Sequence, residues 1–176
     1  MRFQDLLDKG IEFPSEDPPL TPQDIADLES LIQAPLPEDY RDYLLHANGG
    51  EIDLHFTKLN IYGYYTTAHW PKDNGIFEEE EVAHVQYFFA LEKVVRYYKN
   101  WKDKLPADTL VIGTDPGGDF YLMGIGPQNR GKIYIWCFVM ANRMEEPDLM
   151  ARAYLGFIAD NFVELVLSLK KIPEAK

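Results

Sequence analysis

The chain has 176 residues, 46% of them hydrophobic, and this length and apolar content predict a single domain over residues 1–176 with a sizeable core. Its 29 Asp and Glu residues outnumber its 17 Lys and Arg residues, and the net charge of −12 argues against direct binding to nucleic acid or to an anionic membrane. A single cysteine excludes an internal disulfide, and without an apolar run of membrane-spanning length or a signal-peptide pattern the sequence predicts a cytoplasmic protein.

The first 32 residues predict two helices separated by a linker. Residues 1–13 favour a short amphipathic helix, and residues 15–19 form an acidic linker that contains prolines. Thr21 is a good N-cap, because Asp24 follows three residues later as in a capping box. Apolar residues at helical spacing continue this second helix, namely Ile25, Leu28, Leu31 and Ile32.

A third helix begins near Pro37 and ends at Asn48-Gly49-Gly50, since Asn and Gly accept the left-handed conformation that often follows a helix. Its apolar positions have the spacing i, i+3, i+4, i+7 and are Tyr40, Tyr43, Leu44 and Ala47. Residues 51–65 alternate in polarity and predict extended segments. Residues 66–81 have no clear period and are interpreted as a surface loop, whereas residues 82–89 favour extended structure.

The centre of the chain predicts an antiparallel meander that follows a helix over residues 91–101. Three strands rich in β-branched and aromatic residues lie at 109–113, 119–125 and 132–138. Asp115-Pro116-Gly117-Gly118 joins the first two, because Pro fixes φ at a turn and Gly accepts positive φ. The second and third strands are apolar on both faces, so either the fold covers both faces or an aromatic face meets a partner.

The last segment predicts a strand followed by a helix. Residues 153–159 favour the strand, and Asp160 is a plausible N-cap for the helix. The helix places four apolar residues on one face, namely Phe162, Leu165, Val166 and Leu169.

No residues in the sequence form a recognisable catalytic or metal-binding motif. None of the serines lies in a nucleophile elbow, and Cys137 lies within a predicted strand, where a buried structural thiol is expected. The four histidines lack the i, i+4 spacing of a helical zinc site, and the glycine-rich segments lack phosphate-loop and dinucleotide patterns. Asp115 and Asp119 could in principle hold a cation, but their spacing does not match an EF-hand loop, and Asp at the edge of a turn normally caps the turn. We therefore expect no enzyme activity, no cofactor and no metal site.

Three separated segments carry a recognisable pattern. Residues 36–50 form a helix that ends in Asn-Gly-Gly, residues 112–122 form a glycine-rich hairpin, and residues 158–165 join a strand to a helix. In this order and separation they resemble the SMI1/KNR4 family, also called the SUKH superfamily. The matches bracket a core from about residue 21 to residue 169, whereas residues 62–90 match no part of the family pattern.

This resemblance implies a fold and a role. The implied fold is α+β, with helices packed on a central, mostly antiparallel sheet. Bacterial members of the family are widely immunity proteins that bind and neutralise a cognate polymorphic toxin, often a nuclease. Fungal members act through protein contacts as regulators of the cell wall and of signalling. The family has no recognised shared catalytic residues.

The resemblance and the charge together favour an immunity protein, because an acidic surface complements the basic cleft of a nuclease. The candidate contact residues combine aromatic and acidic side chains, and are Tyr62, Tyr64, Tyr65, Trp70, Glu78, Glu79, Glu80 and Glu81. Alternatively, the aromatic residues close the second face of the sheet and the glutamates are a solvated stretch. A regulatory protein-interaction module without a toxin, or a ligand-binding protein that uses Asp115 and Asp119, also remains open, as do monomeric and homodimeric states.

Overall fold

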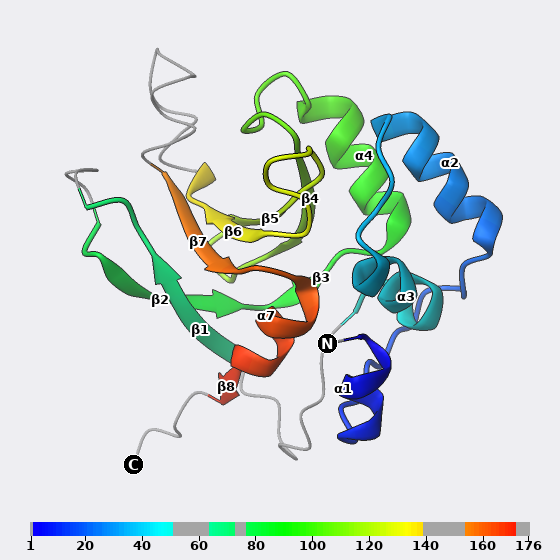
Figure 1. The fold of residues 1–176 in the computed structure, drawn as a ribbon, viewed down its shortest axis with the longest axis horizontal. Helices are drawn as coiled ribbons and strands as arrows, with labels where there is room; N and C mark the ends of the chain where they lie inside the picture. Colours follow the sequence, from blue (N-terminus) through cyan, green and yellow to red (C-terminus); the bar gives the residue numbers. More distant parts are fainter. Residues whose placement is uncertain (1, 51–63, 73–76, 139–153, 172–176) are drawn as a thin grey trace.

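The computed structural model describes residues 2–50, 64–72, 77–138 and 154–171. Its helices are α1 (Gln4–Asp8), α2 (Pro22–Ile32), α3 (Glu38–Ala47), α4 (Leu91–Trp101) and α7 (Phe162–Ser168). Its strands are β1 (Tyr64–His69), β2 (Glu80–Val85), β3 (Tyr87–Phe88), β4 (Thr109–Thr114), β5 (Phe120–Gly124), β6 (Ile133–Trp136), β7 (Leu155–Ala159) and β8 (Lys170–Lys171). Helices α1 to α4 lie to the right of the curled sheet in the view of Figure 1, and the helices and antiparallel strands together confirm the expected α+β class.

The strands pair in the order β2-β1-β7-β6-β5-β4-β3, with β8 also paired to β1. Every pairing between described strands is antiparallel. Only Gln86 separates β2 from β3, so the two strands form one bent segment that pairs with β1 at one end and with β4 at the other. The sheet therefore curls until its ends meet at Gln86, whose backbone N–H donates to the Thr114 carbonyl over 3.1 Å.

The predicted meander is confirmed as β4, β5 and β6. In the first turn, the backbone N–H of Asp119 donates to Asp115 Oδ1 over 2.8 Å, and Gly118 adopts φ of +91°. All residues of β4 and β5 are buried, so the fold covers both faces of these strands. Tyr134 on β6 is only partly buried, and the outer face begins to open there.

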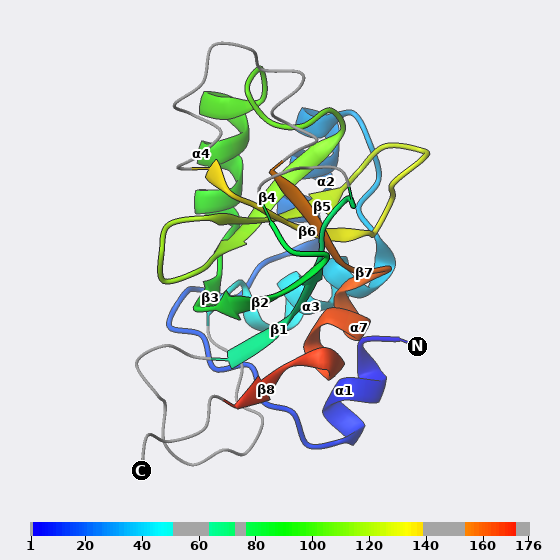
Figure 2. The ribbon, with the colours of Figure 1, turned by 90° about the vertical axis from the view of Figure 1, so that its left-hand side faces the viewer.

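Different helices cover the two faces of the sheet. On the concave face, Tyr43 of α3 and Phe162 of α7 lie with ring centroids 4.5 Å apart, and Phe88 of β3 packs 5.2 Å from Phe162. On the outer face, α4 covers the meander, with Tyr97 5.0 Å from Phe120 of β5. Seen from the left-hand side of Figure 1, β1, β2 and β7 lie in front of α2 and α3 (Figure 2).

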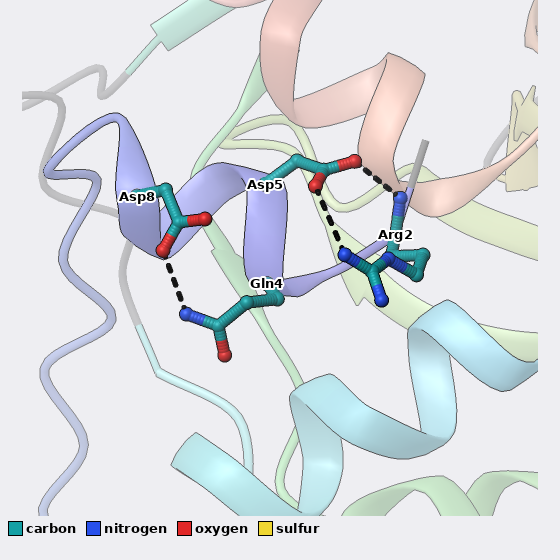
Figure 3. Close-up of polar contacts among 4 residues, drawn as sticks. All are labelled: Arg2, Gln4, Asp5 and Asp8. Atoms are coloured by element: carbon teal, nitrogen blue, oxygen red, sulfur yellow. Dashed lines mark hydrogen bonds and ion pairs between the residues drawn. The ribbon is translucent and has the colours of Figure 1, made fainter.

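Exposed polar side chains form hydrogen bonds and an ion pair along the short helix α1 (Figure 3). The Asp5 carboxylate accepts a hydrogen bond from the Arg2 backbone N–H at 2.7 Å and lies 3.9 Å from the Arg2 guanidinium, while the Gln4 side chain donates to Asp8 over 2.9 Å. Such exposed pairs stabilise a fold only weakly. The main contribution of this segment is apolar, because Phe3 is buried in the core. The amphipathic helix expected within residues 1–13 is confirmed over Gln4–Asp8.

Of the two N-caps predicted from the sequence, one is confirmed and the other is wrong. The capping box of Thr21 and Asp24 is present at the start of α2. Asp160, however, is not the N-cap of α7. That position belongs to Asn161, whose side-chain oxygen accepts the Glu164 backbone N–H at 2.9 Å. Asn161 is favoured because its extended backbone lets the carbonyl of the amide side chain reach the third residue of the helix.

The interpretation of residues 66–81 as a surface loop was wrong at both ends. Residues 66–69 belong to β1 and residues 80–81 to β2. The strands escaped detection because their outward positions carry Thr, His and Glu, so few apolar residues mark the period of two. Residues 51–63, which include most of the predicted extended segments, lie outside the described residues.

Two tyrosines of α3 bring polar atoms into the core. The hydroxyls of Tyr40 and Tyr43 are buried and form no hydrogen bond with the described part of the chain. Burial raises the pKa of both phenols well above the ordinary value of tyrosine. Both side chains therefore act as neutral aromatic packing residues.

This arrangement predicts that Tyr43→Phe will leave the free energy of unfolding unchanged or raise it by up to about 1 kcal/mol, because it removes a buried polar atom without a partner. Tyr121→Phe is the matched control, since the Tyr121 hydroxyl donates to the His84 carbonyl over 3.0 Å. Its loss should cost about 1 kcal/mol. Urea unfolding measures both, and a larger cost for Tyr43→Phe than for Tyr121→Phe would contradict the prediction.

Candidate partner-binding site

Strands β1 and β2 form a hairpin at one end of the sheet. The register pairs Tyr65 with His84 and His69 with Glu80. Side chains of successive residues point to opposite faces of a strand, so these paired residues share one face. On the other face, Ala68 and Ala83 are buried in the curl of the sheet.

The face of the hairpin that points away from the curl is open to solvent. Val82 has an exposed fraction of 59%, and the side chains of His69 and Glu80 are 49% and 70% exposed. The same row continues through Phe157 of β7 to Tyr134 of β6, whose rings lie 6.0 Å apart. We define the outer face by these partly or fully exposed residues, namely Tyr65, Thr67, His69, Glu80, Val82, His84, Tyr134 and Phe157.

The hairpin is strongly acidic. Its described residues include four glutamates and one lysine. Glu79 lies 3.5 Å from the Lys72 ammonium and Glu80 lies 3.6 Å from Nδ1 of His69, and all four side chains are largely exposed. Exposed pairs of this kind hold their partners weakly. The glutamates therefore remain available to a cationic partner.

The structure separates the predicted contact residues into groups. Tyr65 and Glu80 lie on the outer face, and Glu78 and Glu79 are exposed just before β2. Glu81 is partly buried and lies on the other face of β2. The remaining aromatic candidates are Tyr62, which lies outside the described residues, and Tyr64 and Trp70, which are buried.

Trp70 fixes the hairpin to the sheet. Its ring stacks on Phe77 with centroids 3.9 Å apart, and a Cβ on Gly156 of β7 would lie only 2.9 Å from it. Tyr64 is also buried, on the inner face of the hairpin, where the strand register places it opposite Val85. As placed, these aromatic side chains offer little exposed area, and a direct role in binding stays a prediction for them.

Sequence reasoning missed the apolar part of the outer face, which is formed by Val82, Phe157 and Tyr134. The available signal was the predicted extended structure of residues 82–89, because a strand that also includes Glu80 places Val82 on the same face as Glu80 and His84. Phe157 and Tyr134 could not be assigned to this face from local sequence, because helix α4 covers neighbouring positions of the same meander.

The buried groups give no sign of catalytic chemistry. Burial, with a further contribution from the nearby Asp119 carboxylate, raises the pKa of the Cys137 thiol well above its ordinary value, so this thiol stays protonated. Asp115 and Asp119 bond to each other across the turn of the meander. Within the described ranges, no three His, Cys, Asp or Glu side chains are grouped to hold a metal ion.

Two hollows on the surface are lined by described residues away from the hairpin. One, of about 480 Å³, is lined by Pro14 to Asp17 together with Gly50 and Tyr87. The other, of about 550 Å³, lies between α2 and α4. Neither lining contains a histidine, a cysteine or a pair of groups arranged for proton transfer, which leaves the outer face as the strongest candidate site.

An open sheet face next to an acidic hairpin, without a grouped catalytic set among the described residues, is suited to contact with another protein. A family model described as the SMI1 / KNR4 family (SUKH-1) matches residues 19–168, and the chain belongs to this family. The family comprises generally non-catalytic domains of the immunity-protein type. A search of curated proteins found no match. Among the helices that the structure describes, none has the length and apolar content needed to cross a membrane.

Proposed function

We propose that this chain is a cytoplasmic immunity protein that binds a cognate toxin domain one-to-one and neutralises it without catalysis. The toxin domain is cationic, and a nuclease is the class that fits best. The observation that carries the proposal is the acidic hairpin beside an open, partly aromatic face, in a chain of the SMI1/KNR4 family.

The two parts of this surface have different roles in the proposal. Nuclease domains carry basic clefts for phosphate, so Glu78 to Glu80 would speed the encounter by long-range attraction. Tyr65 and Phe157 would then supply most of the apolar contact that holds the complex together, because aromatic side chains buried at the centre of an interface often carry much of the binding energy. Val82 would add apolar area beside them.

A survival assay tests the function. The toxin domain encoded next to this chain is expressed with and without it, and surviving cells are counted. We expect survival only when the chain is present, together with a one-to-one complex in solution. Death of the cells with both proteins present at comparable levels would reject the proposal in favour of a regulatory role without this toxin.

The acidic surface makes a separate prediction. Glu78→Lys with Glu80→Lys should slow association with the toxin domain by about tenfold at low salt and flatten its salt dependence, because exposed interface charges act mainly on the association rate. The matched control is Glu12→Lys with Asp103→Lys, which changes the net charge equally at exposed positions outside the hairpin. Rate constants at several salt concentrations measure the effect. Equal behaviour of the two variants would show that total charge, and not the hairpin, matters.

A further inference from the structure

Strand β2 stands at the end of the strand order, so one of its edges has no neighbouring strand among the described residues. In an antiparallel pair, the backbone groups of alternate residues point toward the partner strand and away from it. The Glu79 carbonyl accepts the Trp70 N–H at 2.9 Å on the β1 side. The His84 carbonyl accepts the Tyr121 hydroxyl at 3.0 Å on the opposite side.

These bonds fix the direction of every backbone group in β2. Odd-numbered residues point their N–H and C=O groups toward β1, and even-numbered residues point them toward the outer edge. Gln86 agrees with this assignment, because its N–H reaches Thr114 of β4 on the outer side. Near the end of β2, Tyr121 bonds to the His84 carbonyl and Thr114 accepts the Gln86 N–H. The outward backbone groups of Glu80 and Val82, in contrast, have no partner in the described part of the chain.

The side chains at this open edge favour a particular kind of strand. Val82 is 59% exposed and is flanked by Glu80 on the same face and by Glu78 and Glu79 before the strand. Edge strands commonly carry charges that prevent pairing with copies of themselves. A second copy of β2 would bring glutamates against glutamates, whereas a strand with Lys or Arg would place opposite charges across the new pair.

We propose that the outer edge of β2, at Glu80 and Val82, binds an extended cationic segment of a partner protein by β-strand addition. In this mode the main-chain hydrogen bonds supply affinity and the alternating side chains supply selectivity. Val82 packs against an apolar residue of the added strand, and the glutamates pair with its basic residues. The proposal rests on the proposed function for the identity of the partner as a toxin domain, but the edge is testable without that toxin.

The first test uses a capped eight-residue peptide with Thr at every second position and Val, Lys and Lys in sequence on its other face, so that in an antiparallel pair Val lies opposite Val82 and the two Lys residues lie opposite Glu80 and Glu78. The same peptide with Glu in place of Lys is the control. Amide hydrogen exchange in the full chain is followed by NMR at low salt. We expect the Lys peptide to slow exchange of the Val82 and Glu80 amides at least tenfold, with little change at Ala83, whose amide already faces β1. Unchanged exchange at Val82, or equal slowing by the Glu peptide, would overturn the proposal.

The second test uses Val82→Pro, which removes an N–H that points away from β1. Proline is tolerated where its missing donor would face solvent on an edge strand, so the fold should survive, as thermal unfolding will verify. Val82→Ala is the matched control that keeps the donor. Val82→Ala should lose the part of the affinity that comes from the side-chain contact, and Val82→Pro should weaken the complexes with the toxin domain and with the Lys peptide at least tenfold further, because it also removes the main-chain donor.

The two tests distinguish failure of this inference from failure of the proposed function. If the toxin domain binds but both variants weaken it equally, strand addition is overturned and the immunity role stands. If the toxin domain does not bind while the Lys peptide protects Val82, the immunity role is rejected and the edge remains a site for cationic strands.

Discussion

Replacing Gly49 with alanine is expected to destabilise the chain by about 3 kcal/mol or more, enough to unfold a marginally stable domain. Gly49 has φ of +86°, which an alanine adopts only with strain, and a Cβ there would lie 2.4 Å from the Ala90 nitrogen and 2.6 Å from the Phe89 carbonyl carbon. Both neighbours are backbone atoms just before α4, so they cannot rotate away as a side chain would. Urea unfolding measures the loss.

Gly118→Ala is the control that separates conformational strain from the collision. Gly118 has φ of +91°, close to that of Gly49, but no atom lies within 4 Å of its added Cβ. This variant should therefore cost only about 1 kcal/mol. Equal costs for the two variants would show that the close approach at Gly49 has no energetic consequence.

Asn48→Ala is expected to cost about 3 kcal/mol, because the neighbouring asparagine joins three parts of the chain. Asn48 ends α3 with φ of +46°, and its buried side chain donates to the Pro18 carbonyl at 2.7 Å. The same side chain accepts the Leu91 N–H at the start of α4 over 2.9 Å. Alanine would leave both backbone groups without this partner and would also disfavour the left-handed backbone.

The control for Asn48 is Gln33, which ends α2 in the same left-handed conformation, with φ of 55°, but has an exposed side chain. Gln33→Ala should cost less than about 1 kcal/mol. Guanidinium unfolding compares the two variants, and similar costs would contradict the role of the Asn48 side chain. Under the proposed immunity function, destabilised variants should protect cells less well because their abundance falls, whereas Val82→Pro should lose protection at normal abundance.

The Asn48-Gly49 pair has a second role that its local sequence does not indicate. Asn48 and Gly49 were expected only to end a helix, which they do. The structure adds that this helix end is also the point where the linker before α2 and the start of α4 meet. Local conformation explains why Asn and Gly are suited to the position, and tertiary contacts explain why it is so sensitive.

Elements whose pattern is local are predictable from the amino-acid sequence alone. Helices α2, α3 and α4 were predicted from apolar residues at helical spacing and from the cap at Thr21, and the meander from its turn residues and β-branched strands. These signals depend on interactions within a few residues, so they remain readable without knowledge of the rest of the chain. The family was recognisable from the same segments.

The composition of the candidate site, in contrast, follows from contacts between residues that are distant in the sequence. Whether Val82 and Phe157 are exposed depends on whether a helix covers their part of the sheet, and α4 covers only the meander. Trp70 is buried because Gly156, 86 positions later, leaves room for its ring. One edge of β2 has no neighbouring strand among the described residues, because the curled sheet closes only from Gln86 onward, where the chain bonds to Thr114. Exposure and edge position are properties of neighbours distant in the sequence, and local periodicity carries no information about them.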